Sequence, residues 1–196
     1  MKIKLIPPLK ILAFLLVLIT IILAINSALC VTERAIHPTR YTDIIKTYSK
    51  AYGVPEYIVL SIINVESHFK KDALSHAGAI GLMQIMPSTF TWLSSEEHLN
   101  EKLDPEELYE PSINIKYGCY YLKYLFEKFQ NWDTVFAAYN AGEGNITNWL
   151  SSPEHSDGVG GLKDIPFEET RNYVKKVNEE ITYYKNTYYK NEVNAR

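Results

Sequence analysis

The sequence predicts a mostly α-helical, single globular domain behind an N-terminal membrane segment. Three observations lead to this prediction. Apolar residues recur at three- and four-residue intervals over much of the chain, an unbroken apolar run lies near the N-terminus, and glycine or proline separates the periodic segments. The chain of 196 residues has room for one ordinary domain and a short appendage.

Composition narrows the class of protein further. Apolar residues make up 46% of the chain and charged residues 22%, which is enough for a packed core and argues against general disorder. Segment 1–31 contains three lysines and no acidic residue, so the remainder has 17 basic and 23 acidic residues, a balance of −6. An acidic body argues against nucleic acid as a partner, because such binding depends on phosphate contacts. Two cysteines are too few for a four-cysteine zinc site or a disulfide framework.

The apolar run near the N-terminus predicts a membrane segment. It extends from Ile11 to Ile25, and Thr20 is its only weakly polar member. The next six residues, up to Val31, carry no charge and lengthen the run to about the 20 residues that a membrane span requires.

Charges around this run predict its orientation. Lys2, Lys4 and Lys10 precede it, and the positive-inside bias then places the body of the protein outside the cytoplasm. We therefore expect an anchor in residues 1–31 and the working domain in residues 32–196. A signal peptide that is cleaved after the same run is the alternative, and it would give a secreted protein.

Glycine and proline divide the body into helical segments. The first covers 41–52, ends at Gly53 and is followed by a second helix that opens at Pro55. Polar and irregular composition predicts loops at 94–109 and 151–164. Further helices are expected at Pro87–Trp92, after Pro111, after Trp132 and from Glu168.

Glu66 stands out on the second helix because it extends an apolar stripe. Ile58, Ile62 and Glu66 follow one another at four-residue intervals, so the three side chains share one face. A carboxyl group at the end of a buried face loses hydration, and this raises its pKa unless a cation or hydrogen-bond donors compensate. Glu66 is therefore a candidate general acid, and an exposed glutamate at the end of a helix is the alternative.

Four motifs, in a fixed order, resemble those of a known family. They are Glu66-Ser67 followed by Phe69, Gly81-Leu82-Met83-Gln84-Ile85-Met86-Pro87, Ala138-Tyr139-Asn140-Ala141-Gly142, and the segment Ile165–Val174 that contains Glu169. They resemble the motifs of the catalytic domain of soluble lytic transglycosylases, relatives of goose-type lysozyme, and the resemblance covers about residues 41–185.

The resemblance implies a lysozyme-like α+β fold that is mostly helical. It also implies cleavage of the β-1,4 bond between N-acetylmuramic acid and N-acetylglucosamine in peptidoglycan, with formation of a 1,6-anhydromuramic acid end. Glu66 is the catalytic residue that it implies, and Tyr139 is a plausible hydrogen-bond partner of Glu66. Substrate-binding roles follow for Ser75, Gln84, Met86, Tyr139, Asn140 and Glu169.

Partners follow from the same resemblance. We expect peptidoglycan glycan strands as the substrate and the bacterial cell membrane as the location, with the protein a monomer. No metal and no cofactor are expected.

The residues around Glu66 fit a reaction in which the attacking group belongs to the sugar and is not a water molecule. Most glycosidases use a second carboxylate, but the segment 73–86 contains none, and Asp72 belongs to a solvated charged run. The C6 hydroxyl of the sugar can then attack C1 while Glu66 first gives and then recovers a proton. Two alternatives remain at this point: a muramidase that hydrolyses the same bond, and a noncatalytic glycan-binding module.

Overall fold

This computed structural model describes residues 8–190, apart from the side chains of residues 8–11, 29, 30 and 34. Lys2, Lys4 and the side chains of Lys10 and Cys30 lie outside the described residues. The chain divides into two compact units, and the division falls between Pro38 and Thr39.

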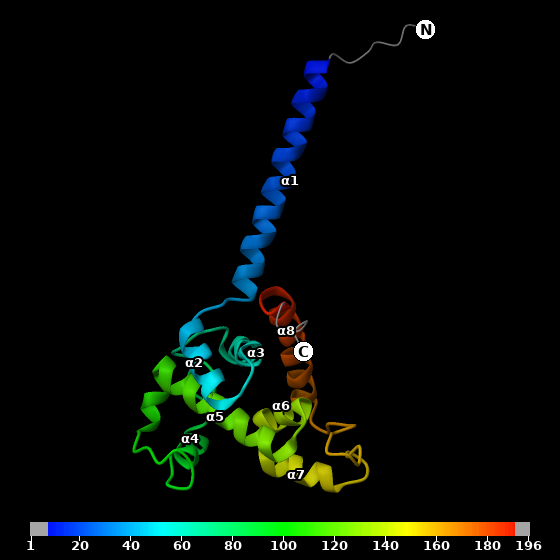
Figure 1. Ribbon diagram of the computed structural model, residues 1–196. Helices are drawn as coiled ribbons and strands as arrows, with labels where there is room; N and C mark the ends of the chain where they lie inside the picture. The colour runs from blue at the N-terminus through cyan, green and yellow to red at the C-terminus, as the bar shows by residue number, and fades with distance from the viewer. Residues whose placement is uncertain (1–7, 191–196) are drawn as a thin grey trace. The chain divides into compact units, whose positions relative to one another are not determined.

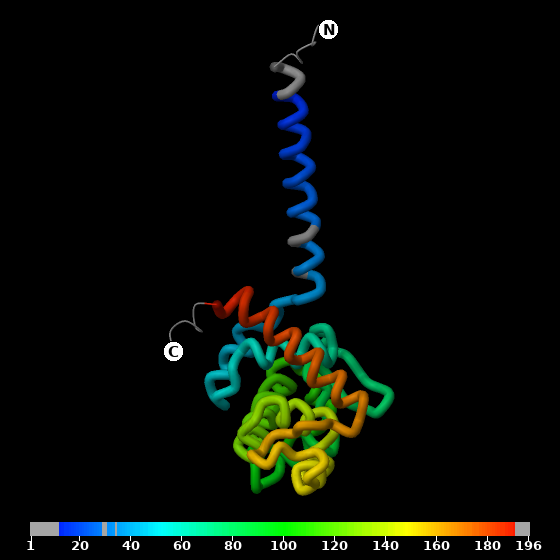
Figure 2. The backbone as a smooth tube through the Cα atoms, turned by 90° about the vertical axis from the view of Figure 1, so that its right-hand side faces the viewer, coloured from blue at the N-terminus to red at the C-terminus, as the bar shows by residue number. Residues whose placement is uncertain are grey.

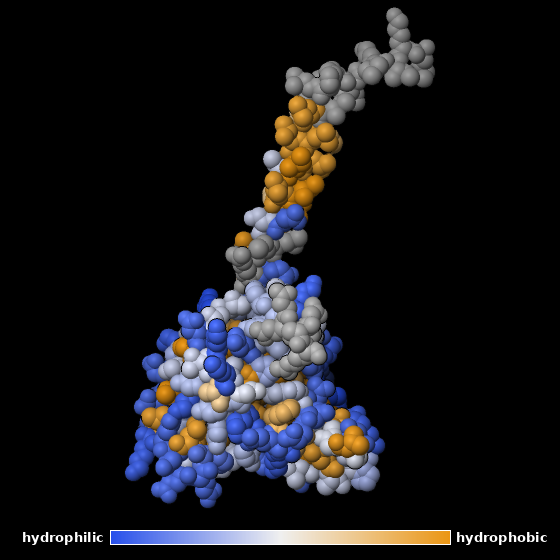
Figure 3. All heavy atoms as spheres, viewed as in Figure 1, coloured by the Kyte–Doolittle hydropathy of each residue, from blue (hydrophilic) through white to orange (hydrophobic). Residues whose placement is uncertain are grey.

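The first unit consists of helix α1, Pro8–Ile36, which continues past residue 31, where the hydropathy pattern placed the end of the anchor. Its segment Leu12–Glu33 has 22 residues and a mean hydropathy of 2.7, so it is long and apolar enough to cross a membrane. Side chains such as Phe14 and Leu23 are more than half exposed, and hydrophobic residues cover a long stretch of the helix in Figure 3. The hydroxyl of Thr20 donates to the Val17 carbonyl, at 2.8 Å, so this polar group is satisfied within the helix.

The second unit is a helical domain (Figure 1). Its elements are α2 (Thr42–Tyr52), α3 (Glu56–Ser67), α4 (Pro87–Leu93), the 3₁₀ helix η1 (Pro105–Tyr109), α5 (Pro111–Phe129), α6 (Trp132–Ala141), α7 (Glu143–Ser151) and α8 (Glu168–Tyr188). Helix α5 packs against α2 and α6, and helix α8 packs against α3 and α6 (Figures 1 and 2). The mostly helical class predicted from the sequence is confirmed.

Most helix boundaries fall where glycine and proline predict them. Gly53 has a φ of 71°, and its N–H donates to the Ser49 carbonyl, which ends α2. The prediction missed α7 because Gly142 has the signature of a helix end. In the structure Gly142 has a φ of 86° and is both the C-cap of α6 and the N-cap of α7.

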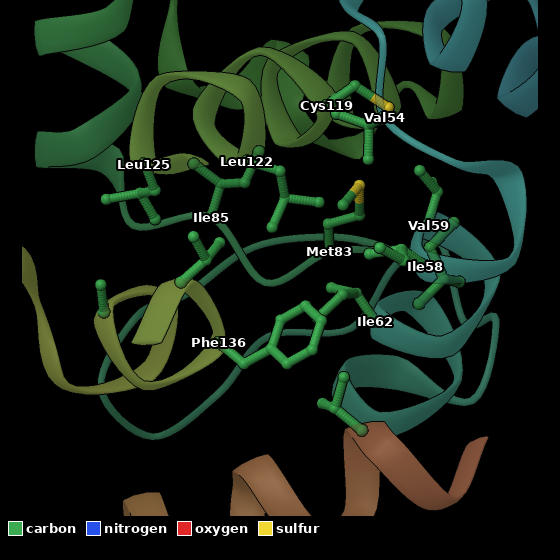
Figure 4. Packing of buried hydrophobic residues seen from close by; sticks show 14 of the residues in the cluster. Val54, Ile58, Val59, Ile62, Met83, Ile85, Cys119, Leu122, Leu125 and Phe136 are labelled. Carbon is green, nitrogen blue, oxygen red and sulfur yellow. The ribbon is translucent and has the colours of Figure 1, made fainter. Parts of the chain in front are cut away.

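The core gathers buried side chains from all the helices of the domain and from the loop 73–86, and Figure 4 shows part of it. Ile62 of α3, Cys119 of α5, Phe136 of α6 and Met83 of the loop 73–86 are all fully buried within it. Cys119 is a free thiol that packs among these apolar side chains.

Extended structure in the described residues is limited to isolated bridges. Two antiparallel bridges pair Leu74 with Ile80 and Ile80 with Ile85, which folds the loop 73–86 back on itself twice. A third antiparallel bridge pairs Ser156 with Leu162 in the loop after α7.

Asn114 of α5 fixes this folded loop to the core. Its Oδ1 accepts from the Met83 N–H at 2.7 Å, while its Nδ2 donates to the carbonyls of Ile80 and Leu108 at 2.9 and 2.8 Å. Gly81, with a φ of 79°, passes so close that a Cβ there would overlap the Leu108 carbonyl and the Asn114 amide. Asn114 itself is fully buried, so these hydrogen bonds form away from solvent.

We predict that Asn114→Ala lowers the free energy of unfolding by about 2–4 kcal/mol, because one N–H and two carbonyls lose their buried partner. Chemical denaturation of the full chain in detergent measures this change. Asn186→Ala, at an exposed site on α8, is the matched control and should change stability by less than about 0.5 kcal/mol. A loss below about 1 kcal/mol for Asn114→Ala would show that other contacts hold the loop.

Candidate active site

Glu66 lies in the last turn of helix α3, at the edge of the core. Ile58 and Ile62, on the same face, are 2% and 0% exposed, whereas Glu66 is only partly buried. The apolar stripe predicted from the sequence is therefore present, and the carboxyl group lies where the core meets solvent. This position restricts its hydration while leaving it accessible to a substrate.

The chain turns sharply directly after Glu66. His68 and Phe69 have φ values of 48° and 61°, in the left-handed region that residues other than glycine rarely adopt. The buried Phe69 ring holds this turn to the core. Ser67 joins the end of α3 to the loop 73–86, because its hydroxyl donates to the Leu82 carbonyl at 2.7 Å.

Burial raises the pKa of Glu66 from 4.5 to about 7. A hydrogen bond from the Tyr173 hydroxyl to Glu66 Oε1, at 2.7 Å, acts in the opposite direction because it stabilises the carboxylate. Near neutral pH, the group can therefore both donate and accept a proton, which is what a general acid and base requires.

Tyr139 is not the hydrogen-bond donor to Glu66, and this expectation from the sequence was wrong. Its hydroxyl donates instead to the Met83 carbonyl at 2.8 Å, and a phenol has one hydrogen to donate. Tyr173 of α8 takes the position beside the carboxylate. The sequence did contain a signal for it, since Tyr173 lies in the fourth motif and on the buried face of the last helix.

Both tyrosines remain protonated near neutral pH. Burial, with a further contribution from the negative charge of Glu66, raises the pKa of Tyr139 and of Tyr173 well above 10. The negative charge of Glu66 therefore acts on both hydroxyls. Tyr173 is hydrogen-bonded to Glu66, whereas Tyr139 is hydrogen-bonded to the loop 73–86.

The side chains of Ser75 and Gln84 form hydrogen bonds within the loop 73–86. The hydroxyl of Ser75 accepts from the Ala79 N–H at 2.9 Å and closes a tight turn. Gln84 has a φ of 49°, and its Nε2 donates to the carbonyls of Gly81 and Ala73 at 2.8 and 3.2 Å. Each side chain thus has a structural role, and its contact with substrate remains a prediction.

The other predicted site residues lie on three different elements. Met86 precedes α4 and is 37% exposed. Asn140, near the end of α6, accepts from the Thr170 hydroxyl at 2.8 Å, which joins α6 to the first turn of α8. Glu169, in that same turn, is exposed and forms no hydrogen bond with the other predicted site residues in the part of the chain that the structure describes.

Removing the Tyr173 hydroxyl tests its electrostatic role directly. In Tyr173→Phe the carboxylate loses a stabilising donor, so we expect the pKa of Glu66 to rise from about 7 by roughly one pH unit. NMR of isotopically labelled glutamate carboxyl groups measures the titration. Tyr188→Phe, at an exposed position, should leave it unchanged. An unchanged or lowered value in Tyr173→Phe would contradict the assigned hydrogen bond.

Comparison with known proteins gives a consistent result. Residues 43–158 match the family model described as the transglycosylase SLT domain. The soluble lytic murein transglycosylase of Escherichia coli K12 is 38% identical over 151 residues, which is 76% of this chain and 23% of that protein. The membrane-bound lytic murein transglycosylase C of Actinobacillus pleuropneumoniae is 29% identical over 160 residues, with 70% of this chain and 44% of that protein covered.

Solved structures agree in fold. The 70 kDa soluble lytic transglycosylase of Escherichia coli matches with a TM-score of 0.69 and 36% identity, over 76% of this chain and 24% of that one. An inactive variant of the lytic transglycosylase Slt of Pseudomonas aeruginosa matches with a TM-score of 0.68 and 32% identity, over 76% and 24%. This chain thus spans about a quarter of the length of its soluble relatives. Because the family model covers more than half of the chain, the protein belongs to the transglycosylase SLT domain family.

Proposed function

We propose that this protein is a peptidoglycan lytic transglycosylase. It cleaves the β-1,4 bond between N-acetylmuramic acid and N-acetylglucosamine and leaves a 1,6-anhydromuramic acid end. The observation that supports this proposal most directly is the Glu66 carboxyl group, which burial brings to a pKa of about 7. Proteins similar to this chain are named lytic murein transglycosylases, which is consistent with the proposal.

The reaction needs one acid that acts twice. Protonated Glu66 gives its proton to the glycosidic oxygen, the bond to C1 breaks, and N-acetylglucosamine leaves with a free C4 hydroxyl. The substrate's own N-acetyl group stabilises the positive charge at C1. The Glu66 carboxylate then takes the proton of the C6 hydroxyl as that oxygen bonds to C1, so the enzyme returns to its starting state and no water is consumed.

The surroundings of Glu66 favour this route over hydrolysis. A glycosidase that activates water or forms a covalent intermediate commonly has a second carboxylate roughly 5–10 Å from the acid. The loop 73–86, which Ser67 joins to the end of α3, contains no acidic residue, and the pKa of Glu66 reflects burial and the hydrogen bond from Tyr173. Asp104, one of the acidic residues of the segment 94–109, instead caps η1 by accepting from the Glu106 N–H at 3.1 Å.

The products test this proposal. After digestion of purified peptidoglycan in heavy-oxygen water, mass spectrometry should find 1,6-anhydromuramic acid ends that carry no label. Glu66→Gln is the matched control, because it keeps the volume of the side chain but removes the transferable proton. Its activity should fall by about 10²–10⁴-fold. Reducing muramic acid ends that contain solvent oxygen would instead identify a muramidase.

We also propose that α1 is a single membrane anchor, with the lysines before it in the cytoplasm and the domain outside. In this arrangement the protein is a monomer that acts on glycan strands close to the bacterial cell membrane, and nucleic acid is not among its partners. The length and hydropathy of α1 support the anchor, and a membrane-bound relative is consistent with it.

The orientation can be measured in cells. Protease added to intact protoplasts should digest the domain, and detergent should be needed to release the protein from membranes. A soluble mature protein whose N-terminus lies near residue 31 would instead establish a cleaved signal peptide and a secreted enzyme.

A further inference from the structure

A pocket lies at the opposite end of α3 from Glu66, and none of its lining residues belongs to the four motifs. Its walls come from the last two turns of α2, the turn between α2 and α3, the first turn of α3 and the end of α8. Its volume of about 480 Å³ is within the roughly 300–1,000 Å³ that small-molecule sites have. We call it the lysine pocket.

Positive charge predominates in the lysine pocket. Lys46 and Lys50 lie one turn apart on α2, and Lys185 comes from α8. Three positive charges and the one negative charge of Glu56 leave a balance of +2, in a body whose overall balance is −6. In the part of the chain that the structure describes, no carboxylate forms an ion pair with these lysines. Like charges one turn apart repel each other, and an anion between them removes that repulsion.

Two tyrosines position the other charged groups of the pocket. The ammonium group of Lys185 lies 5.6 Å from the centre of the Tyr57 ring, in a cation–π contact. Tyr189 packs edge to face on Tyr57, with ring centroids 5.9 Å apart, and its hydroxyl donates to the Glu56 carboxylate at 2.9 Å. The one acidic group of the pocket thus has a phenol as its partner, and the ammonium of Lys185 is held in place.

Ser49, on the same face of α2 as the lysines, is a buried polar group without a partner. It lines the pocket and is 5% exposed, and its hydroxyl forms no hydrogen bond with any described residue. Thr47 of the same helix, in contrast, donates to the Asp43 carbonyl at 2.8 Å, and Ser61 of α3 donates to the Tyr57 carbonyl at 2.7 Å. Native proteins rarely leave a buried hydroxyl unpaired. An oxygen atom of a ligand in the pocket would supply the partner.

The N-terminus of α3 adds main-chain donors to the pocket. Pro55 has no N–H, and the N–H groups of Glu56 and Tyr57 belong to the first turn, where a helix offers no acceptor of its own. The partial positive charge of a helix N-terminus attracts anions. Donors therefore come from three helices. A phosphate group has oxygen atoms that point in several directions and suits such an arrangement, whereas the two oxygens of a carboxylate lie in one plane.

We propose that the lysine pocket is a binding site for a phosphate ester, whose phosphate group contacts Lys46, Lys50 and Lys185. A phosphate oxygen accepts from the Ser49 hydroxyl, and the organic part of the ester fills the remaining volume. A soluble ester and the headgroup of a phospholipid carry the same chemical group. Residues 37–41 are the whole connection between α1 and α2, so a headgroup is one available source in a membrane-anchored chain. The site itself does not depend on the anchor.

Calorimetry with glycerol phosphate tests the site. The full-length protein is kept in a maltoside detergent, which contains no phosphate, and acetate at the same ionic strength is the comparison anion. Glycerol phosphate should bind saturably and more tightly than acetate. Lys50→Gln and Lys185→Gln should each weaken its binding by about tenfold, the effect of one lost charge-assisted hydrogen bond. Lys176→Gln, at an exposed position of α8 outside the pocket, is the matched control and should leave the affinity unchanged.

Ser49→Ala separates a ligand contact from a structural role. Because the hydroxyl has no partner in the protein, its removal should leave the Tm of the ligand-free protein unchanged or raised. The affinity for glycerol phosphate should nevertheless fall, so the ligand should raise the Tm of Ser49→Ala less than that of the wild type. A serine that only supports the fold would show the opposite pattern, with a lowered Tm and an unchanged affinity.

Lipid nanodiscs distinguish the two sources of the phosphate group. Discs that contain phosphatidylglycerol are compared with discs that contain oleate at the same surface charge. If the lipid headgroup occupies the pocket, phosphatidylglycerol should weaken the binding of glycerol phosphate relative to oleate, and Lys50→Gln should abolish that difference. Equal binding in both discs identifies a soluble ester as the ligand.

Three results would overturn the site: no saturable binding of glycerol phosphate in detergent, binding of acetate with equal affinity, or an equal loss of affinity in Lys176→Gln and Lys50→Gln. The last result would indicate attraction by overall charge and not by the pocket. None of these measurements involves cleavage of peptidoglycan, so such a failure leaves the proposed function unaffected.

Discussion

Glu66 carries its carboxyl group at the boundary between an apolar core and solvent, and the loss of hydration there raises its pKa to about 7. The surrounding structure maintains this condition. Helix α3 supplies the buried stripe, and helix α8 packs against α3 and supplies the hydroxyl of Tyr173. A fully polar surrounding would give an acid with no proton to donate, and a fully apolar one would give an acid that could not release it.

The loop beside Glu66 is positioned mainly through its main chain. Ser67 of α3, Asn114 of α5 and Tyr139 of α6 each bond to a backbone atom of residues 82–83. Hydrogen bonds from three helices that are distant in sequence thus fix one short stretch of backbone. A site of this kind depends on the path of the chain, so a change on any of the three helices can displace the loop without touching a substrate.

The sequence was sufficient for most of the helices, though not for α7, and for the position of Glu66 at the end of a buried stripe, because these features depend on local patterns. Hydrophobic periodicity predicted α3 and placed Glu66 on its buried face, and Gly53 marked the end of α2. It was not sufficient for the partner of Glu66, since Tyr139 and Tyr173 both lie near apolar stripes. Which hydroxyl reaches the carboxylate depends on how α6 and α8 pack against α3, and no local pattern in the sequence records that geometry.

Burial of Glu66 also ties the stability of the domain to pH. The folded protein holds this proton with a pKa of about 7, whereas an ordinary glutamate in the unfolded chain releases it near 4.5. Between these values the folded state binds more protons than the unfolded state, so this residue's contribution to stability falls as the pH rises. The total change is roughly 3 kcal/mol, a sizeable share of the 5–15 kcal/mol that typically holds a domain folded. The burial that brings the pKa of Glu66 near 7 therefore also makes the fold less stable at neutral pH than at about pH 4–5.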